Sequence, residues 1–575
     1  EQANCKKPFS RLWISSMEES AIREGFSNLK DGRSYDDLYQ SALCRAKADW
    51  LVGINATRLF SILYHKTLNV GRVQTPTLTM LVNRDYAISS FKKEKYHVVR
   101  LDAGGVSALS ERLNDEAAAQ QMKTACEKSQ AVCTSLKKEK KTVAPPKLFD
   151  LTALQREANR LYGFTAKQTL DYAQALYEKR LLTYPRTDSK YITSDMQRST
   201  KELITGLCSL LPFMRDVKLQ ADLTRVCDNS RVTDHHAILP TAEFLKAGFS
   251  SLADSETKLM TLVCAKLLCA AAAPYEYEAV TAVISCGGYT FTAKGKTTLC
   301  EGWREIEKLS HAASEEQDED AEPEAVLPPL AEGQTFDNPA AEISERYTQP
   351  PKAYTEDTLL SAMENAGKEE TPEDAERKGL GTTATRAGII EKLISAGFAE
   401  RKGKKLIPTK DGYNLVAILP DSLTSPQLTA EWETRLTGIA KGSDSPADFM
   451  RGIEEMTAGL VKTYSAISED KAKLFTPQRE AIGTCPRCGA AVYEGKKNYY
   501  CSDRACSFVM WKNDLFFQQR KKTFTKAIAA ALLKDGKVKI KGMYSTKTGK
   551  TFDGVVLLAD TGGKYVNFRV EQNRK

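Results

Sequence analysis

The sequence has no hydrophobic run long enough to cross a membrane. Its longest apolar stretch, residues 262–273, is interrupted by Lys266 and is shorter than the roughly 20 residues that a span needs, so it predicts a buried helix. A secretory leader and an internal repeat are also missing. These absences favour a cytoplasmic protein with no membrane contact. The length of 575 residues, 42% of them hydrophobic, suits about three to five domains.

Cysteine is too sparse and too scattered for a disulfide framework. Of the 14 cysteines, four form two close pairs, Cys485 with Cys488 and Cys501 with Cys506. Such pairs on turns place four thiolates about 2.3 Å from Zn²⁺, so we expect a four-cysteine zinc ribbon over residues 480–515. The other ten are expected to be small buried side chains: Cys5, Cys44, Cys126, Cys133, Cys208, Cys227, Cys264, Cys269, Cys286 and Cys300. Four aromatic residues near the second pair either stack on DNA bases or form the core of the ribbon: Tyr499, Tyr500, Phe508 and Trp511.

Positive charge is concentrated near the C-terminus. Residues 476–575 contain 20 Lys or Arg and 8 Asp or Glu, a net charge of +12, so the rest of the chain carries −4. A basic module suits sequence-independent contact with DNA phosphates, although lysine-rich surfaces are often merely solvated. Residues 534–570 alternate apolar and polar side chains, so we expect a basic, β-rich, DNA-binding module over residues 516–575. An acidic run within residues 312–330 predicts a flexible loop.

The octapeptide Leu-Thr-Tyr-Pro-Arg-Thr-Asp-Ser, residues 182–189, places a tyrosine hydroxyl beside a guanidinium on a turn that contains proline. Tyrosine is a weak nucleophile because its ordinary pKa is about 10, so catalysis by Tyr184 needs a cation or a base nearby. The planar fork of Arg186 matches phosphate oxygens. The alternative is a buried tyrosine on an ordinary loop.

A helix is predicted just before this octapeptide. Thr165 and Gln168 form a capping box, and apolar residues then follow at helical spacing as far as Glu178. Pro185 prevents the helix from continuing through the tyrosine. The sequence therefore predicts that Tyr184 lies on a turn that follows a helix end.

The octapeptide resembles the active-site motif of the type IA DNA topoisomerases, which cut one DNA strand through a 5′-phosphotyrosine link. The resemblance runs from about Arg11 to the C-terminus, and residues 11–16 and 75–77 are most like the bacterial topoisomerase III branch. Other blocks agree with the family in order: Arg45 with Asp49, residues 71–77, Leu154 with Gln155, residues 174–178, residues 234–241 and residues 379–386.

The resemblance implies a role for each block. Tyr184 attacks a phosphodiester, and Arg186 stabilises charge on the phosphoryl oxygens. His235 binds the phosphate or moves a proton, unless it is an ordinary core histidine, and His236 stands where the family often has an acid. The residues that position single-stranded DNA are Arg45, Arg72, Gln74, Gln155, Glu178, Thr385 and Arg386. The alternatives are a surface salt bridge for Arg45 and, for Glu178, a contact with Arg186 or a solvated helix end.

By the same resemblance we expect a multidomain α+β protein. A toroidal core of helical domains with a strand-rich arch precedes the zinc ribbon and the β-rich module. The expected boundaries are 11–91 and 345–475 for a helical DNA-binding domain with a winged-helix-like element, 92–146 and 277–344 for the arch, and 147–276 for the tyrosine domain. A helix over residues 385–396 and a basic wing over residues 401–409 form the winged element. Residues 137–141, which precede a proline pair, predict a charged linker.

The chain begins at Glu1, with only about ten residues before the block that follows the Toprim domain in this family. We therefore expect residues 1–10 to be a remnant of that domain, and the Mg²⁺ site to lie in its missing part. The resemblance implies a monomer that cuts, passes and rejoins strands without ATP. Its substrates would be single-stranded and negatively supercoiled DNA, which it would relax or decatenate. The alternative is an inactive fragment that only binds single-stranded DNA.

Two other enzyme classes are excluded by the histidines. Tyrosine recombinases and type IB topoisomerases carry a His-x-x-Arg element, but Ile238 and Leu239 stand three residues after His235 and His236. A relaxase needs histidines on either side of an apolar residue, and here the two are adjacent.

Overall fold

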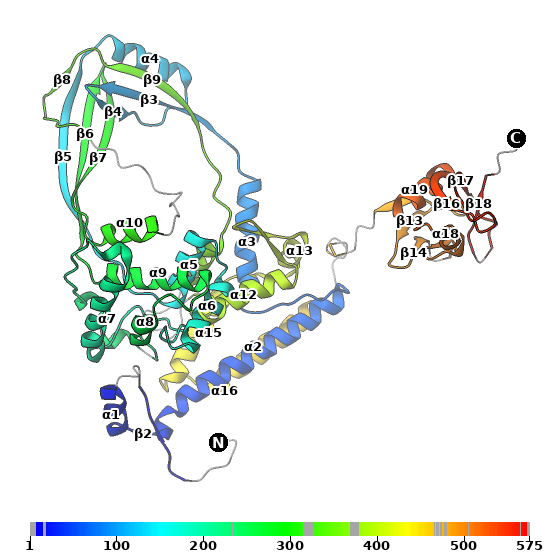
Figure 1. Ribbon diagram of the computed structural model, residues 1–575, viewed down its shortest axis with the longest axis horizontal. Coiled ribbons are helices and arrows are strands. Elements are labelled where there is room, and N and C mark those ends of the chain that lie inside the picture. Colours follow the sequence, from blue (N-terminus) through cyan, green and yellow to red (C-terminus); the bar gives the residue numbers. More distant parts are fainter. Residues whose placement is uncertain are drawn as a thin grey trace. The chain divides into compact units, whose positions relative to one another are not determined.

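The computed structural model of the protein describes residues 7–14, 19–232, 234–313, 327–367, 379–464, 466, 471, 474–475, 480–503, 505–563 and 565–571 (Figure 1). The chain divides into two compact units, Glu1–Lys471 and Ala472–Lys575. Cys5, the last two residues of the block at residues 11–16, and most of the predicted acidic loop lie outside the described residues. Within the part that the structure describes, no helix is both long enough and apolar enough to cross a membrane.

The arch of the first unit is a seven-stranded antiparallel sheet in the order β8-β5-β6-β7-β4-β3-β9. Its strands are β3 (Lys95–Ala103), β4 (Val106–Leu109), β5 (Ala131–Val143), β6 (Tyr275–Cys286), β7 (Tyr289–Cys300), β8 (Thr335–Phe336) and β9 (Ala340–Tyr347). Helix α4 (Glu116–Glu127) packs Ala119, Met122 and Cys126 into the hydrophobic cluster of this sheet. In Figure 1 the sheet arches over the helices, which confirms the predicted strand-rich arch.

The predicted charged linker at residues 137–141 is wrong, because these residues lie in the middle of β5. They pair with β6 in an unbroken register from Lys137↔Thr281 to Lys141↔Tyr277. A strand needs partners for its backbone groups, and its solvent-facing side chains can be charged. Lys140, for example, makes an ion pair with Glu276 at 2.7 Å on the neighbouring strand.

A bundle of long helices forms one side of the base. Helix α2 (Asp36–Leu63) buries Cys44, Ala48, Val52, Ala56 and Phe60, which recur every four residues and therefore lie on one face. This face packs against α15 (Gln427–Ala440) and α16 (Pro446–Thr463). The other elements are β1 (Ser10–Arg11), α1 (Glu19–Ser27), β2 (Lys30–Asp31), α3 (Gln74–Ser89), α11 (Glu356–Asn365), α13 (Lys410–Ile418) and α14 (Asp421–Thr424).

The predicted helix and wing are present. Helix α12 (Thr383–Ser395) precedes a hairpin of β10 (Ala399–Lys402) and β11 (Lys405–Pro408), paired from Ala399↔Pro408 to Lys402↔Lys405. Arg401 in the hairpin donates to the buried carboxylate of Glu356 at 2.8 Å, and Glu356 also accepts the Ala166 backbone N–H at 2.6 Å. The wing is therefore tied to the start of the helix that precedes the tyrosine.

That helix is α6 (Ala166–Glu178), and it begins at the predicted capping box of Thr165 and Gln168. It belongs to a large hydrophobic cluster that also takes in the buried helix predicted at residues 262–273, which is the second half of α9 (Asp254–Ala270). The other helices around this cluster are α5 (Leu151–Tyr162), α7 (Gln197–Leu210), α8 (Ala242–Ala247) and α10 (Trp303–Ala313). Short 3-10 turns cover Gly32–Tyr35, Ser194–Met196, Pro212–Met214, Thr224–Val226 and Asn229–Arg231.

The second unit contains two small sheets that share one core. The strands β12 (Ala481–Thr484), β13 (Ala491–Glu494), β14 (Asn498–Cys501) and β15 (Val509–Trp511) form a meander, and β16 (Lys537–Tyr544), β17 (Thr551–Ala559) and β18 (Asn567–Val570) form the second sheet. Helices α18 (Leu515–Gln519) and α19 (Lys526–Asp535) connect them. One hydrophobic cluster includes Val492 from the first sheet, Phe517 and Phe524 between them, and Val556 from the second.

This core also decides between the two readings of the aromatic residues. Tyr499 and Phe508 are fully buried in it, whereas the side chain of Trp511 is 40% exposed. Tyr499 and Phe508 are therefore core residues of the small unit. Of the nine scattered cysteines that the structure describes, six are buried: Cys44, Cys126, Cys133, Cys264, Cys269 and Cys286.

Candidate functional site

The tyrosine turn is fastened to the histidine block by a short ladder of hydrogen bonds. Leu182 bridges Pro240, the Thr183 backbone N–H donates to Leu239 O at 2.9 Å, and the Leu239 N–H donates to Thr183 Oγ1 at 2.8 Å. These bonds join the tyrosine turn to the histidine block directly beside Tyr184.

A second set of bonds lies on the other side of the tyrosine. The buried hydroxyl of Thr187 donates to the carbonyl oxygen of His235 at 3.0 Å. The Leu151 N–H donates to Thr187 O at 3.1 Å, and the Ala237 N–H donates to Tyr191 O at 2.8 Å. Because bonds flank Tyr184 on both sides, the positions of Tyr184 and His235 relative to each other are fixed by backbone.

The structure brings Tyr184 and His235, both predicted to be catalytic residues, into contact. Their ring centroids lie 4.4 Å apart with an angle of 46° between the ring planes. The ring of Tyr177, from the last turn of α6, packs edge-on against Tyr184 at 5.4 Å. Tyr184 is half-buried, so its ring is held on two sides and still reaches solvent.

Tyr184 faces a cavity of about 930 Å³. The described residues that line it are Ile14, Tyr177, Glu178, Arg180, Leu182, Thr183, Tyr184, Asp234, His235, His236 and Thr241. Two phenols, two imidazoles, two carboxylates and a guanidinium therefore surround one space large enough for part of a polymer. Groups of this kind can supply a nucleophile, move protons and bind phosphate oxygens.

Arg186 is not among the described residues that line this cavity, although the sequence pairs it with Tyr184. Its side chain is exposed and makes no ion pair with another described residue. Glu178 does line the cavity, and its Oε1 accepts a hydrogen bond from Gln174 Nε2 at 3.0 Å, not from Arg186. His236 Nδ1 lies 2.8 Å from the carbonyl oxygen of Ala237.

A second cavity, of about 390 Å³, contains four of the residues predicted to position DNA: Arg45, Arg72, Gln74 and Thr385. Both arginines bind the carboxylate of Glu433, a residue that the sequence analysis missed. Glu433 accepts from Arg45 Nη2 at 2.6 Å and from Arg72 Nη1 at 3.2 Å, and Arg72 also donates to Asp49 at 2.7 Å. Arg45 is thus in a buried ion pair and not in a surface one.

Burial alone would lower the pKa of Arg72, but the carboxylates of Asp49 and Glu433 outweigh it and raise that pKa. The guanidinium also lies over the ring of Trp432, 4.9 Å from its centroid. The sequence carries a signal for Glu433, since it follows Ala430 and precedes Leu436 at helical spacing on the buried face of α15. A charged residue at such a position needs a buried partner.

Gln155 and Arg386 line neither cavity among the described residues. Gln155 is fully buried and donates to the carbonyl of Ala166 at 2.9 Å, at the start of α6. Arg386 is 3% exposed and donates to Thr152 Oγ1 at 3.0 Å, and burial lowers its pKa. Both side chains join elements around the tyrosine turn.

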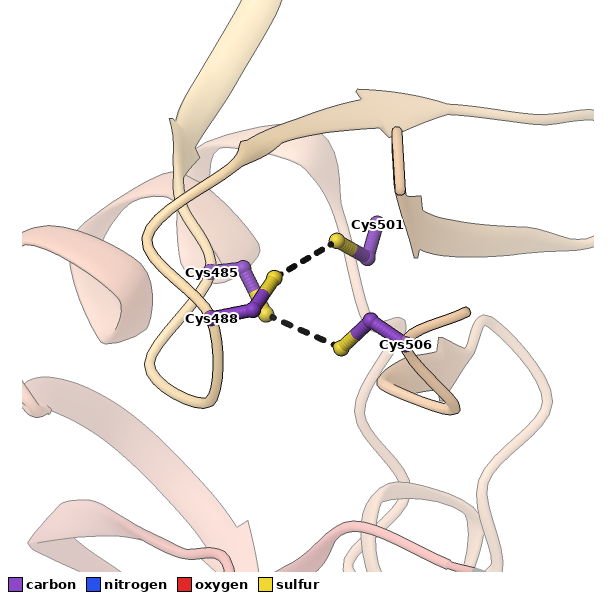
Figure 2. Close-up of side chains that lie close together, drawn as sticks. All are labelled: Cys485, Cys488, Cys501 and Cys506. Carbon is purple, nitrogen blue, oxygen red and sulfur yellow. Dashed lines mark hydrogen bonds between the residues drawn. The ribbon is translucent and has the colours of Figure 1, made fainter. Parts of the chain in front are cut away.

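The four predicted zinc ligands converge in the second unit (Figure 2). Their Sγ atoms all lie within 4.8 Å of one another, with Cys488 and Cys501 at 3.3 Å and Cys485 and Cys506 at 3.7 Å. Thiolates about 2.3 Å from one ion lie about 3.8 Å apart at the corners of a tetrahedron. The cluster therefore fits Zn²⁺ in number, type and spacing of ligands.

One other group of possible metal ligands occurs among the described residues: Glu157, Glu307 and His311. The ammonium of Lys266 already neutralises Glu157 at 2.7 Å. Neither group lines the tyrosine cavity.

Comparisons with known proteins agree on one class. A family model described as DNA topoisomerase matches residues 33–451. The protein named DNA topoisomerase 3 from Bacillus licheniformis is 38% identical over 532 residues, which cover 88% of this chain and 71% of that protein. Its namesake from Bacillus subtilis is also 38% identical, with 88% and 72% covered.

The fold agrees with a solved structure. Full-length topoisomerase I from Thermotoga maritima matches with a TM-score of 0.63 and 23% identity, over 87% of this chain and 80% of that one. The chain belongs to the DNA topoisomerase family, within type IA and like topoisomerase III. It is therefore an isomerase.

Proposed function

We propose that the protein cuts one DNA strand with Tyr184, passes another strand through the break and rejoins the ends without ATP. The phenol oxygen of Tyr184 forms a bond to phosphorus while the bond to the 3′ oxygen breaks, which gives a 5′-phosphotyrosine and a free 3′ hydroxyl. Attack by that hydroxyl reverses the step, so the energy of the phosphodiester is conserved. Such a cycle relaxes negative supercoils or decatenates DNA.

The contact between Tyr184 and His235 carries this proposal. A nucleophilic phenol must lose its proton as it attacks, and His235, whose ring contacts that of Tyr184, has ring nitrogens able to accept or share it. The hydrogen bond from Thr187 to the backbone of His235 holds the two rings together. Arg186, exposed two residues after the nucleophile, would stabilise charge on the phosphoryl oxygens when a strand is bound.

The second cavity would bind a part of the strand that lies at some distance from the bond that is cut. Gln74 and Thr385 offer polar groups to phosphate and sugar, and these fix the register of a strand without reading its sequence. Arg45 and Arg72 already share Glu433, so they would shape this cavity and weaken its negative charge. We assign Gln155 and Arg386 the task of holding the surrounding helices in place.

The four cysteines would hold Zn²⁺ as a structural ion in the second unit. The ion would cross-link two turns and would take no part in the chemistry on DNA. With its charge of +12 over residues 476–575, this unit would bind phosphates without sequence preference. The family resemblance also implies Mg²⁺, which none of these steps uses.

A labelled single-stranded oligonucleotide tests the proposal directly. If Tyr184 becomes linked to the 5′ phosphate, a label at the 3′ end of the DNA moves to the protein, and a label at the 5′ end leaves on a shortened strand. Transfer of the 5′ label would contradict the stated polarity. Binding without transfer of either label, with Mg²⁺ present, would favour the alternative of a DNA-binding protein that does not cut.

A further inference from the structure

The end of α6 has a conformation that its residue type does not favour. The backbone N–H of Arg180 donates to Tyr177 O at 2.8 Å, and the N–H of Leu181 donates to Leu176 O at 2.9 Å. This pair of bonds is the Schellman motif, which ends a helix with one residue in the left-handed region. That residue is Arg180, with φ of +62°.

Glycine usually occupies this position, because a Cβ crowds the backbone at positive φ. The two leucines of the motif are buried in the large hydrophobic cluster, and Thr241 Oγ1 donates to the carbonyl of Arg180 at 2.6 Å. The turn is thus fixed by its surroundings, and the strain of the arginine is retained. Strain of this kind is concentrated at functional sites.

The side chain of Arg180 lines the cavity of Tyr184. It makes no hydrogen bond or ion pair with another described residue, and its side chain is exposed. Among the described residues that line this cavity, it is the only one with a fixed positive charge, while Glu178 and Asp234 bring two carboxylates. A phosphodiester that enters the cavity would be repelled by these carboxylates unless Arg180 binds it.

We propose that Arg180 binds a backbone phosphate of the strand held against Tyr184, next to the one that is cut, and so positions the strand. Its guanidinium can bind two phosphate oxygens at once, which fixes the orientation as well as the charge of the contact. The proposal rests on the proposed function, because it requires that this cavity takes a DNA strand. It explains why an arginine occupies a position that favours glycine.

Replacement of Arg180 by glycine should change stability and DNA binding in opposite directions. Arg180→Gly removes the strain and should raise the unfolding temperature, yet it should weaken binding of a short, mixed-sequence single-stranded oligonucleotide. The slope of log K against log salt concentration should become shallower by about 0.7, the value for one phosphate contact to a single strand. A purely structural role would not change this slope.

His65 offers a matched control. It has φ of +50° after α2, where its N–H donates to Ile62 O at 3.4 Å and the N–H of Lys66 donates to Ser61 O at 3.2 Å. It does not line the tyrosine cavity. His65→Gly should therefore raise the unfolding temperature in the same way and leave the salt slope unchanged.

Arg180→Lys separates charge from geometry. It should keep the salt slope and still lower the affinity, because an ammonium cannot reproduce the planar fork. The proposal is overturned if Arg180→Gly binds the oligonucleotide with the affinity and slope of the unaltered chain. An unaltered chain that neither binds nor captures the oligonucleotide would instead refute the proposed function.

Discussion

The tyrosine turn and the cysteine turns are both short irregular segments, but the protein holds them by different means. Residues 182–187 are joined to the histidine block by backbone hydrogen bonds, on top of the large hydrophobic cluster that contains α6 and α9. The cysteine turns belong to a small unit with two short sheets and one modest cluster. Small domains bury a smaller share of their surface and need additional links.

The difference shows which kind of site depends on its surroundings and which on a bound ion. Around Tyr184, hydrogen bonds and ring contacts within the protein orient Tyr184 and His235. Four thiols close together instead stabilise a fold only when a cation binds their deprotonated form. Substitution of Tyr184 should therefore abolish DNA cleavage without changing stability. Loss of the ion from the cysteine cluster should lower stability without acting directly on the chemistry.

The largest effect expected is the complete loss of the covalent adduct in Tyr184→Phe. This change removes one hydroxyl from a half-buried ring whose contacts with Tyr177 and His235 are ring contacts. The unfolding temperature and oligonucleotide binding should therefore remain unchanged. Tyr177→Phe is the control, because it makes the same change 5.4 Å away and should keep the adduct. An adduct that persists in Tyr184→Phe would show that another residue is the nucleophile.

Metal removal should have the second largest effect, and only on the small unit. The purified protein should hold about one Zn²⁺, and its loss through a chelator or Cys501→Ser should cost this unit about 10 kcal/mol, which is enough to unfold it. Limited proteolysis should then digest residues 480–571 and leave the digestion of the first unit unchanged. Cys300→Ser, at an exposed cysteine in the arch, should change neither zinc content nor digestion. Protein without zinc that still resists digestion would contradict the assignment.

Much of the tyrosine site could be predicted because its signals are local. The capping box, the helix that follows and the proline after Tyr184 all act within a few residues of one another. The histidine block was found only through its resemblance to the family. Arg186, by contrast, was predicted beside Tyr184 from its spacing; its side chain is exposed, and it is not among the described residues that line the cavity.

Long-range contacts were not predictable in the same way. Glu433 joins Arg45 and Arg72 across 388 and 361 residues, and no local pattern pairs them. Residues 137–141 read as a linker because their partner strand begins at Tyr275, far along the chain. In both cases the charge of the side chains was visible in the sequence, while the partner that gives that charge its role was not.

The third effect comes from an ion pair that supports the cysteine turns. Arg487, between Cys485 and Cys488, donates to both carboxylate oxygens of Asp560 at 2.7 and 2.6 Å, and both side chains are largely buried. Asp560→Asn should destabilise the small unit by about 3 kcal/mol, because it leaves the guanidinium without its counter-charge. The matched control is Asp535→Asn, which makes the same change at an exposed position of this unit.

The pH dependence of this pair has a definite sign. The hydrogen bonds from Arg487 hold the pKa of Asp560 below its ordinary value. A depressed carboxyl pKa adds stability that is fully present above about pH 4, the unfolded value, and is lost as the pH falls through the folded value. The difference in stability between the unaltered chain and Asp560→Asn should therefore shrink in acid. A difference that stays constant from neutral pH to about pH 2 would contradict this role.

The smallest effect is expected from the same substitution, threonine to alanine at a helix N-cap, made once in each of the two units. Thr165 and Thr525 each cap a helix, with Oγ1 accepting from Gln168 N at 3.1 Å and from Ile528 N at 3.4 Å. Replacing either threonine by alanine should cost about 1 kcal/mol. Because the entropy of unfolding grows with the size of the unit, Thr525→Ala should lower the unfolding temperature of the small unit by about 4–8 °C, and Thr165→Ala should lower that of the large unit by less than about 2 °C. Differential scanning calorimetry of both variants measures this directly. Equal shifts in the unfolding temperature would mean that the two units unfold together. The stability of the cysteine turns would then depend on that of the large unit.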